Sequence, residues 1–313
     1  MTQFARVLPE STTARLVSER LTGAALVGNP DRPIRAIGAL SARQAGVLAF
    51  CDAAKTAERL PAASAAVIIV AHGTSVHPGG GQTLIAVDDV RAAFIDTVDW
   101  LLPGSGRPAD PVPGVDASAQ IDASASISPL ACIGAAVHIG AGTRVAPGAI
   151  VYPDTRIGRD CNIGPGAIIG WVGLAYHDRA DGRRSFFPHL AGVRIGDRVD
   201  VGAKTCVCRG MLSHTAIGDD AKIGSLVYVS HGVAVAERAW VSAGTAIAGH
   251  ATIAAGALLG IGSIVIDNVD LGADVMVAGG SVVTRAAGAG AKLHGIPAQA
   301  VAAMRRFGPT PRD

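Results

Sequence analysis

An aliphatic residue returns at every sixth position through most of the chain between residues 115 and 283. The last stretch of this series has no miss and contains Ile217, Ile223, Val229, Val235, Val241, Ile247, Ile253, Leu259, Val265, Leu271, Val277 and Val283. A period of six matches neither an α-helix, at about 3.6 residues per turn, nor an alternating strand, at 2. It is typical of a solenoid in which each unit is a short strand followed by a turn, and three units close one coil.

The residues beside these aliphatic positions are mostly Gly, Ala, Ser, Asp or Asn, as in 133–135 and 163–167. Small residues and residues that tolerate a positive φ suit tight corners between short strands. An Ala/Gly-rich low-complexity segment would not keep this register for so long. The pattern resembles that of hexapeptide-repeat helices, and this resemblance, rather than the period, implies a left-handed coil. The predicted fold is therefore mainly β, a left-handed parallel β-helix with a small N-terminal α/β domain and a short C-terminal tail.

The N-terminal third of the chain has a different texture. Residues 12–21 and 90–102 favour helices, whereas 65–70 and 83–87 read as two buried strands. Pro and Gly are concentrated in 103–108 and 111–113, which is typical of a linker. We predict a small α/β domain over 1–102, a linker over 103–114, the β-helix over 115–285 and a tail over 286–313.

The six-residue phase breaks twice. Between Ile169 and Ile195 lies a segment rich in aromatic residues and arginines, namely Trp171, Tyr176, Phe186, Phe187, Arg179, Arg183 and Arg184. Insertions in solenoids leave the coil at its corners and often line a binding face, so an extruded loop is predicted here. A loop whose aromatics only cover the adjacent coil is an equal alternative. The second break, 209–216, is shorter.

Composition narrows the possible partners. Lys and Arg total 27 and Asp and Glu total 25, so the net charge of +2 gives no basic field for nucleic acid. The longest plain apolar run, 65–71, is far shorter than the roughly 20 residues that span a bilayer, and no signal peptide is evident at the N-terminus. We therefore expect a cytoplasmic protein with no integral membrane span. The cysteines lack zinc-finger spacing, and Cys206 and Cys208 are expected to point to opposite faces of a strand, so no metal site is predicted.

His231 is the strongest candidate for chemistry, because it stands at a corner of the coil instead of in the core. Residues 18 apart should lie one above the other at about 4.8 Å, the spacing of paired strands. That register places Gly249 over His231, His250 over Gly232 and Asn268 over His250. A base, a backbone N–H and two polar side chains on one edge suit acyl transfer to an amine or a hydroxyl.

Residues 217–299 resemble the UDP-3-O-(3-hydroxyacyl)glucosamine N-acyltransferases of lipid A assembly, and the resemblance extends to nearly the whole chain. The residues that carry it are Ser230-His231 with Val233, Ala243-Gly244, Ile247-Ala248-Gly249, Gly295-Ile296-Pro297-Ala298-Gln299, Ile169-Gly170 with Gly173 and Tyr176, and Arg209-Gly210. The closing Gly-Ile-Pro-Ala is common to many hexapeptide acyltransferases.

This resemblance implies an activity and a set of residues. His231 matches the general base that takes a proton from the sugar amine, and Gly249 matches the backbone N–H that stabilises the oxyanion. Phe50 matches an aromatic residue that stacks on the uracil ring. The further substrate-binding candidates are Tyr176, Arg209, His250 and Asn268. It also implies an acyl thioester of acyl carrier protein, or of coenzyme A, as co-substrate with no other cofactor, and a homotrimer with active sites between subunits.

The chain departs from the family pattern at several of its polar positions. Cys208 replaces the Asp of the family's Asp-Arg-Gly motif, and Gly224 replaces the carboxylate seven residues before the histidine. Gly232 replaces an Asn and Asn268 a His, while Ala53 and Thr56 replace the Asn and Tyr that join Phe50 around uridine; the expected helical tail is also short, over 301–307.

Two alternatives to the acyltransferase function remain open. The first is a catalytically inactive relative that acts as a binding or scaffold protein. The second is a metal-dependent enzyme of the carbonic anhydrase kind, which needs three clustered imidazoles from adjacent subunits. His214, His231 and His250 do not have the spacing of that family.

Overall fold

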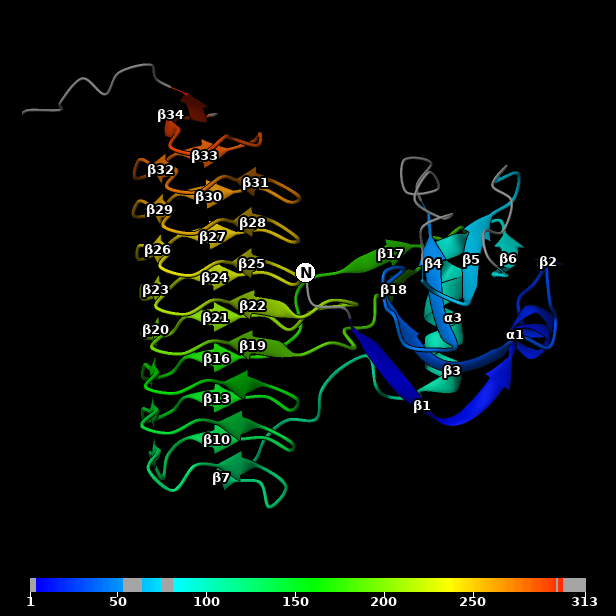
Figure 1. Cartoon of the computed structure of the whole chain (residues 1–313), viewed down its shortest axis with the longest axis horizontal. Coiled ribbons are helices and arrows are strands. Elements are labelled where there is room, and N and C mark those ends of the chain that lie inside the picture. Colours follow the sequence, from blue (N-terminus) through cyan, green and yellow to red (C-terminus); the bar gives the residue numbers. More distant parts are fainter. Residues whose placement is uncertain (1–3, 53–63, 75–80, 297, 301–313) are drawn as a thin grey trace, which may run out of the picture. The chain divides into compact units, whose positions relative to one another are not determined.

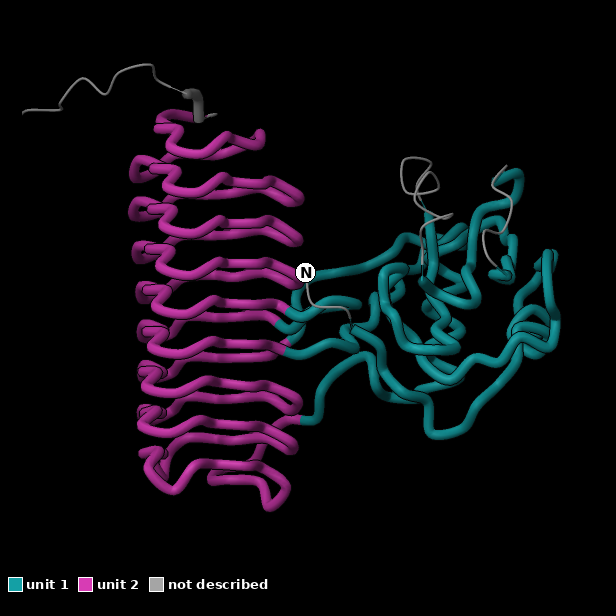
Figure 2. Tube along the Cα trace, viewed as in Figure 1, with its two compact units in different colours: residues 1–109, 172–192, 209–214 teal, residues 110–171, 193–208, 215–313 magenta. Residues whose placement is uncertain are grey.

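The computed structural model describes residues 4–52, 64–74, 81–296 and 298–300, and it divides into two compact units (Figure 2). The first unit takes in 1–109, 172–192 and 209–214, and the second takes in 110–171, 193–208 and 215–313. Both units are therefore built from more than one segment of the chain.

The first unit contains a six-stranded mixed sheet in the order β1-β3-β4-β5-β6-β2. Its elements are β1 (Ala5–Thr13), α1 (Ala14–Arg20), β2 (Ala25–Val27), β3 (Pro33–Gly38), β4 (Val47–Cys51), β5 (Val67–Ala71), β6 (Thr83–Val87) and α3 (Val90–Leu101). β3 to β6 run parallel, whereas β1 and β2 pair antiparallel at the two edges. The strands and helices expected near 12–21, 65–70, 83–87 and 90–102 are confirmed.

Helix α3 shows why the sequence is helical at this point. The Asp89 side chain accepts a hydrogen bond from the backbone N–H of Ala92 at 3.0 Å and so caps the first turn. Phe94 and Val98, four residues apart, are buried and lie on one face. The same face holds the helix in the apolar core of this unit.

The second unit is a solenoid of three parallel sheets (Figure 1). The first sheet consists of β7 (Gly114–Val115), β10 (Cys132–Ile133), β13 (Ile150–Val151), β16 (Ile168–Ile169), β21 (Cys206–Val207), β24 (Tyr228–Val229), β27 (Ala246–Ile247), β30 (Ile264–Val265) and β33 (Val282–Val283). The second consists of β8 (Gln120–Ile121), β11 (His138–Ile139), β14 (Arg156–Ile157), β19 (Val193–Ile195), β22 (Thr215–Ile217), β25 (Ala234–Val235), β28 (Thr252–Ile253) and β31 (Asp270–Leu271). The third consists of β9 (Ser126–Ile127), β12 (Arg144–Val145), β15 (Asn162–Ile163), β20 (Asp200–Val201), β23 (Lys222–Ile223), β26 (Trp240–Val241), β29 (Leu258–Leu259), β32 (Met276–Val277), β34 (Lys292–Gly295) and β35 (Ala298–Ala300).

The aliphatic residue of each hexad points into the solenoid and stacks on its equivalent one coil away. Val229 pairs with Ile247, and Ile247 with Val265, so the predicted 18-residue register is confirmed in this stretch. These side chains form one continuous buried cluster along the unit. The predicted parallel β-helix is thus correct, and strand pairing continues past residue 285, because β34 pairs with β32. The short helix expected over 301–307 lies outside the described residues.

The two breaks in the hexad phase are places where the chain leaves the solenoid and returns to it. Residues 172–192 and 209–214 belong to the first unit, and the longer segment folds as a hairpin of β17 (Tyr176–Asp178) and β18 (Arg184–Phe186). The ladder continues across both excursions, since Ile169 pairs directly with Val207, and Ile195 with Ile217. The sequence predicted the excursions but not that they complete the other unit.

The expectation that Cys206 and Cys208 point to opposite faces was wrong. The two residues flank Val207, which points into the core, and the Cys208 thiol donates to the Tyr228 hydroxyl at 3.4 Å. The reason is that side chains alternate along a strand, so residues i and i+2 share a side.

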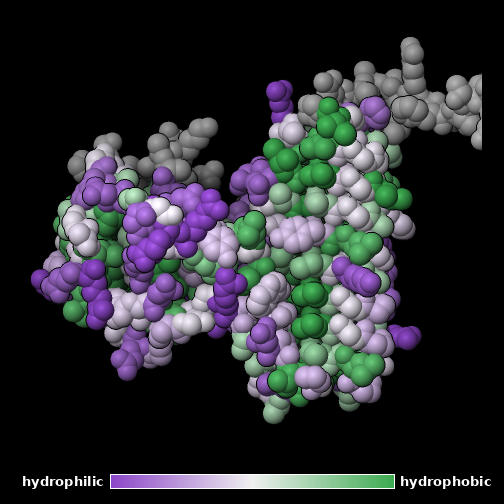
Figure 3. All heavy atoms as spheres, turned by 180° about the vertical axis from the view of Figure 1, so that it is seen from behind, coloured by the Kyte–Doolittle hydropathy of each residue, from purple (hydrophilic) through white to green (hydrophobic). Residues whose placement is uncertain are grey.

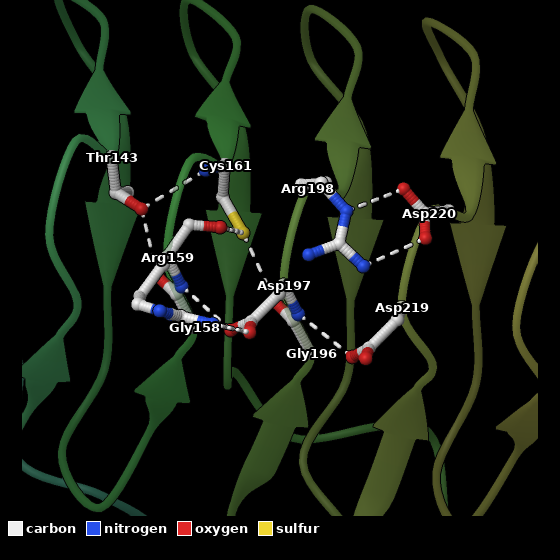
Figure 4. Close-up of polar contacts among 9 residues, drawn as sticks. All are labelled: Thr143, Gly158, Arg159, Cys161, Gly196, Asp197, Arg198, Asp219 and Asp220. Carbon is white, nitrogen blue, oxygen red and sulfur yellow. Dashed lines mark hydrogen bonds and ion pairs between the residues drawn. The ribbon is translucent and has the colours of Figure 1, made fainter.

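Carboxylates at the corners bind backbone N–H groups of the neighbouring coil (Figure 4). The backbone N–H of Arg159 donates to Oδ1 of Asp197 at 2.8 Å, and the N–H of Asp197 donates to Oδ1 of Asp219 at 2.9 Å. All three residues stand two positions after the aliphatic residue of their hexad. This arrangement satisfies corner N–H groups that the strand ladders leave over.

No helix among the described residues is long and apolar enough to cross a membrane.

Replacing a stacked core residue should destabilise the solenoid strongly. Ile163 is fully buried, so Ile163→Ala removes packed methylene groups and leaves a cavity that costs about 2–5 kcal/mol. Leu130→Ala is the matched control, because Leu130 is 71% exposed and its truncation should change stability by less than about 0.5 kcal/mol. Urea unfolding followed by circular dichroism measures both, and equal effects of the two changes would contradict the stacked core.

Candidate functional site

His231 lies at the corner that follows β24, two positions after the buried Val229. Its imidazole is half-buried and meets the ring of His250, with ring centroids 5.0 Å apart and an interplanar angle of 67°. The backbone continues the ladder here, because the N–H of His250 donates to the carbonyl of His231 at 3.0 Å. The two histidines are therefore an edge-to-face pair on adjacent coils.

The imidazole of His231 rests on the backbone of Gly249, as the 18-residue register predicts. A Cβ atom on Gly249 would lie 2.6 Å from Cε1 and 3.1 Å from Nε2 of His231. Any side chain at position 249 would push the ring away, so glycine keeps the imidazole close to the coil.

Gly232 makes the corresponding space for His250. A Cβ atom on Gly232 would lie 2.5 Å from Nδ1 of His250, and Gly232 has a φ of +68°. The Asn that the resembled family has at this position would overlap the His250 ring. The replacement of that Asn by Gly232 thus leaves room for the His250 ring.

Burial keeps both imidazoles neutral at physiological pH. Desolvation, with a contribution from His250, lowers the pKa of His231 to about 4, and the negative charge of Asp267 opposes this shift. Desolvation also lowers the pKa of His250, again opposed by Asp267. A neutral imidazole can accept a proton, as a general base must.

Asp267 is a member of the site that the sequence reasoning missed. It stands one coil beyond Gly249, and its Oδ1 accepts the backbone N–H of Gly249 at 2.7 Å. The point where a Gly249 Cβ would sit is 3.0 Å from this oxygen and 3.1 Å from Nε2 of His231, so the two atoms are at most about 6 Å apart. The register that located Gly249 could have located Asp267 as well, since the two are 18 positions apart.

The carboxylate that the resembled family has seven residues before the histidine would have no room at Gly224. A Cβ atom on Gly224 would lie 2.7 Å from the backbone nitrogen of Ala243. The carboxylate that acts on the two histidines is instead Asp267, which follows them in the chain, whereas position 224 precedes them.

Asn268 contacts the backbone of Gly249 through its own backbone. Its N–H donates to the carbonyl of Gly249 at 2.9 Å, and its φ of +59° is one that Asn tolerates better than most residues. A role for its side chain in substrate binding stays a prediction.

Phe50, Tyr176 and Arg209 belong to the first unit. Phe50 packs against Phe94, with centroids 4.7 Å apart, and against Phe187, at 5.6 Å. The side chain of Phe50 is only partly buried, and its role in stacking on a nucleobase stays a prediction. Ala53 and Thr56, which were expected beside it, lie outside the described residues.

The other two candidates of that unit make contacts within it. Tyr176 packs edge-on against Phe186 and accepts a hydrogen bond from Arg107 at 3.3 Å. Arg209 is buried and its Nε donates to the carbonyl of Ala191 at 2.8 Å. Their roles toward a substrate stay predictions.

Among the residues that the structure describes, no group of three or more His, Cys, Asp or Glu side chains is arranged to hold a metal ion. What the corner does offer is a neutral imidazole, a backbone N–H beside it and a carboxylate. This set can remove a proton from an attacking group and, once the N–H is released, stabilise a developing oxyanion.

Known proteins of one kind match this chain. Residues 136–170 match the family model for bacterial transferase hexapeptide (six repeats). The chain is 37% identical over 279 residues to a UDP-3-O-acylglucosamine N-acyltransferase of Delftia acidovorans, covering 86% of this chain and 81% of the relative. A protein of the same name from Leptothrix cholodnii is 36% identical over 233 residues, covering 67% of this chain and 68% of the relative.

A solved UDP-N-acetylglucosamine acyltransferase of Francisella novicida shares 20% identity over 60% of this chain and 68% of that one, with a TM-score of 0.48. A likeness of this size adds nothing to the fold described above. The two sequence relatives decide the matter, since both are more than 30% identical and the chain covers more than two thirds of each. The chain belongs to the UDP-3-O-acylglucosamine N-acyltransferase family.

Proposed function

We propose that the protein transfers an acyl group from a thioester to the amine of a UDP-linked amino sugar, in lipid A synthesis. The observation that carries this proposal is the neutral imidazole of His231 resting on the backbone of Gly249. The two groups stand where a proton acceptor and an oxyanion donor are needed side by side. Membership of the family supplies the class of substrate.

The proposed reaction needs one proton acceptor, which is a side chain of the protein, and no cofactor besides the acyl thioester. The sugar amine attacks the thioester carbonyl carbon, a C–N bond forms, and the carbonyl oxygen takes the negative charge. His231 accepts the proton that the nitrogen loses and becomes an imidazolium. The C–S bond then breaks, the electrons return to form the amide carbonyl, and the imidazolium gives its proton to the departing thiolate.

Stabilising the oxyanion requires that the backbone N–H of Gly249 be available as a donor. The N–H of Gly249 is the donor proposed for the thioester oxygen, and removing one such donor typically costs about 3 kcal/mol of barrier. In the structure this N–H donates to Asp267, so Asp267 has to release it before the donor carbonyl can bind.

The proposed donor is acyl carrier protein or coenzyme A, and the proposed assembly is a homotrimer. Apolar side chains form a band along the face of the solenoid seen in Figure 3. Large apolar residues of this unit with substantial exposure include Trp240, Ile261 and Ile264. Exposed apolar surface of this kind marks subunit contacts, and a rotationally symmetric assembly would bury it.

The second candidate function is a binding or scaffold protein without turnover. The bond between Asp267 and the N–H of Gly249 favours it, because that bond occupies the proposed oxyanion donor. Turnover of any UDP-linked amino sugar excludes this candidate.

His231→Ala should lower kcat about 10²-fold or more, because a general base typically contributes a factor of this size. The corner position should leave the fold intact, which circular dichroism and thermal melting check. His138→Ala is the matched control, since His138 projects from strand β11, another strand of the same solenoid, and should leave kcat unchanged. Kinetics with a UDP-amino sugar and an acyl thioester make the measurement, and near-normal turnover by His231→Ala would show that the base is another group.

The His231 imidazole should stay neutral down to about pH 5. Its folded pKa, about 4, lies below the usual value near 6.5, so its ability to accept a proton is lost only as the pH falls through the lower value. Imidazole ¹⁵N signals, assigned to His231 by their absence in His231→Ala, follow this titration. A midpoint near 6.5 would contradict the burial of the ring.

The protein should sediment as a trimer at micromolar concentration. Burial of exposed apolar residues such as Trp240 provides the free energy of assembly. Trp240→Lys should weaken the trimer if the exposed side chain of Trp240 lies at the subunit contact, whereas Arg183→Glu, at an exposed site on the first unit, should not. A monomeric wild type in analytical ultracentrifugation refutes the assembly.

A further inference from the structure

We propose that Asp267 is a positioning residue that exchanges partners during the reaction: it holds the N–H of Gly249 in the free protein and moves to the imidazolium of His231 when the donor carbonyl takes that N–H. This inference rests on the proposed function and adds a residue that the resemblance did not supply. It is carried by three observations on the described residues.

The first observation is the place of the carboxylate. Oδ1 of Asp267 accepts the N–H of Gly249 at 2.7 Å, which is short for a backbone donor and typical of a charged acceptor. One N–H cannot make full bonds to this oxygen and to a thioester oxygen at once. A negative carboxylate left at that position would also repel the developing oxyanion. The reaction therefore requires that Asp267 move.

The second observation is where Asp267 can go. Its side chain is exposed, and its bonded oxygen and Nε2 of His231 both lie within 3.1 Å of the point where a Gly249 Cβ would sit. The imidazole carries no charge in the free protein but gains a positive charge when it accepts the amine proton. A short rotation then exchanges a charged-acceptor bond to an amide for an ion pair with the imidazolium.

The third observation is that the other ionisable groups named at this corner do not supply a negative charge to the His231 imidazolium. His250 lowers the pKa of His231, whereas Asp267 raises it. The neighbouring Cys206 thiol, together with burial, raises the pKa of Cys208, and burial raises the pKa of Tyr228, so both stay protonated and uncharged. Arg285 stands 18 positions after Asp267, and a guanidinium cannot stabilise a positively charged imidazolium.

The solenoid also contains the same hydrogen bond without a histidine. Asp219 occupies the equivalent place in its hexad and accepts the N–H of Asp197 at 2.9 Å (Figure 4). A purely structural capping role would give Asp219 and Asp267 equal importance. Comparing the two separates capping from catalysis.

The experiment compares Asp267→Asn with Asp219→Asn. An amide oxygen can still accept the backbone N–H, so both variants keep the capping bond and lose only the charge. Asp267→Asn should lower kcat about tenfold or more, because the imidazolium loses its carboxylate partner, while KM for the acyl donor should not rise, because a neutral acceptor competes more weakly for the N–H of Gly249. Asp219→Asn should leave both constants unchanged.

Histidine titration gives a readout that does not need turnover. Removing the negative charge should lower the pKa of His231 and of His250, so the titration midpoints of both rings should lie at lower pH in Asp267→Asn than in the wild type. Asp219→Asn should titrate like the wild type.

The contrary outcomes are distinct. An unchanged kcat, or equal losses in both variants, overturns the inference and leaves Asp267 a corner cap. A rise in kcat would show that Asp267 only blocks the N–H of Gly249. A wild type that turns over no UDP-amino sugar would instead overturn the proposed function, and an unchanged histidine titration in Asp267→Asn would then overturn the inference separately.

Discussion

The in-register stacking of one aliphatic residue per hexad is the constraint on which this protein depends. Each coil bonds only to its neighbours, so an inward residue such as Ile247 fixes the height and direction of every residue around it. His231, Gly249 and Asp267 each stand two positions after such a residue, on three successive coils. A slip of one position would turn the histidine toward the core and remove the site altogether.

The corners of the solenoid carry a second constraint, which is the supply of acceptors for backbone N–H groups. At Arg159 and Asp197 the acceptor is a carboxylate from the next coil, and at Gly249 it is Asp267. The same hydrogen bond therefore stabilises the corners at Arg159 and Asp197, and at Gly249 it also occupies a group that the proposed reaction needs. The N–H that an enzyme needs for an oxyanion is, in a solenoid, an N–H that the free protein has a reason to cap.

Much of this could be predicted from the sequence, because a period of six is a strong signal and a fixed register follows from it. The stacking of Gly249 on His231 and of His250 on Gly232 was predicted in this way, and Asp267 obeys the same rule. Other features could not be read. The return of 172–192 and 209–214 to the first unit depends on contacts far apart in the chain, and the low pKa of His231 depends on burial by neighbouring coils. The lack of space at Gly224 follows from the backbone of the next coil, which no pattern of residue types reveals.

The low pKa of His231 creates a difficulty that the carboxylate can relieve. A buried neutral imidazole is always available as a base, but the same burial makes it a weak one, since its charged form is poorly solvated. A carboxylate fixed beside the ring would raise the pKa, yet it would also stand beside the developing oxyanion. A carboxylate that rests on a backbone N–H until the donor arrives, and then turns to the ring, approaches the imidazole most closely when the imidazole is charged. Asp267, exposed and bonded to the backbone of the glycine on which the ring rests, has the position that this division of roles requires.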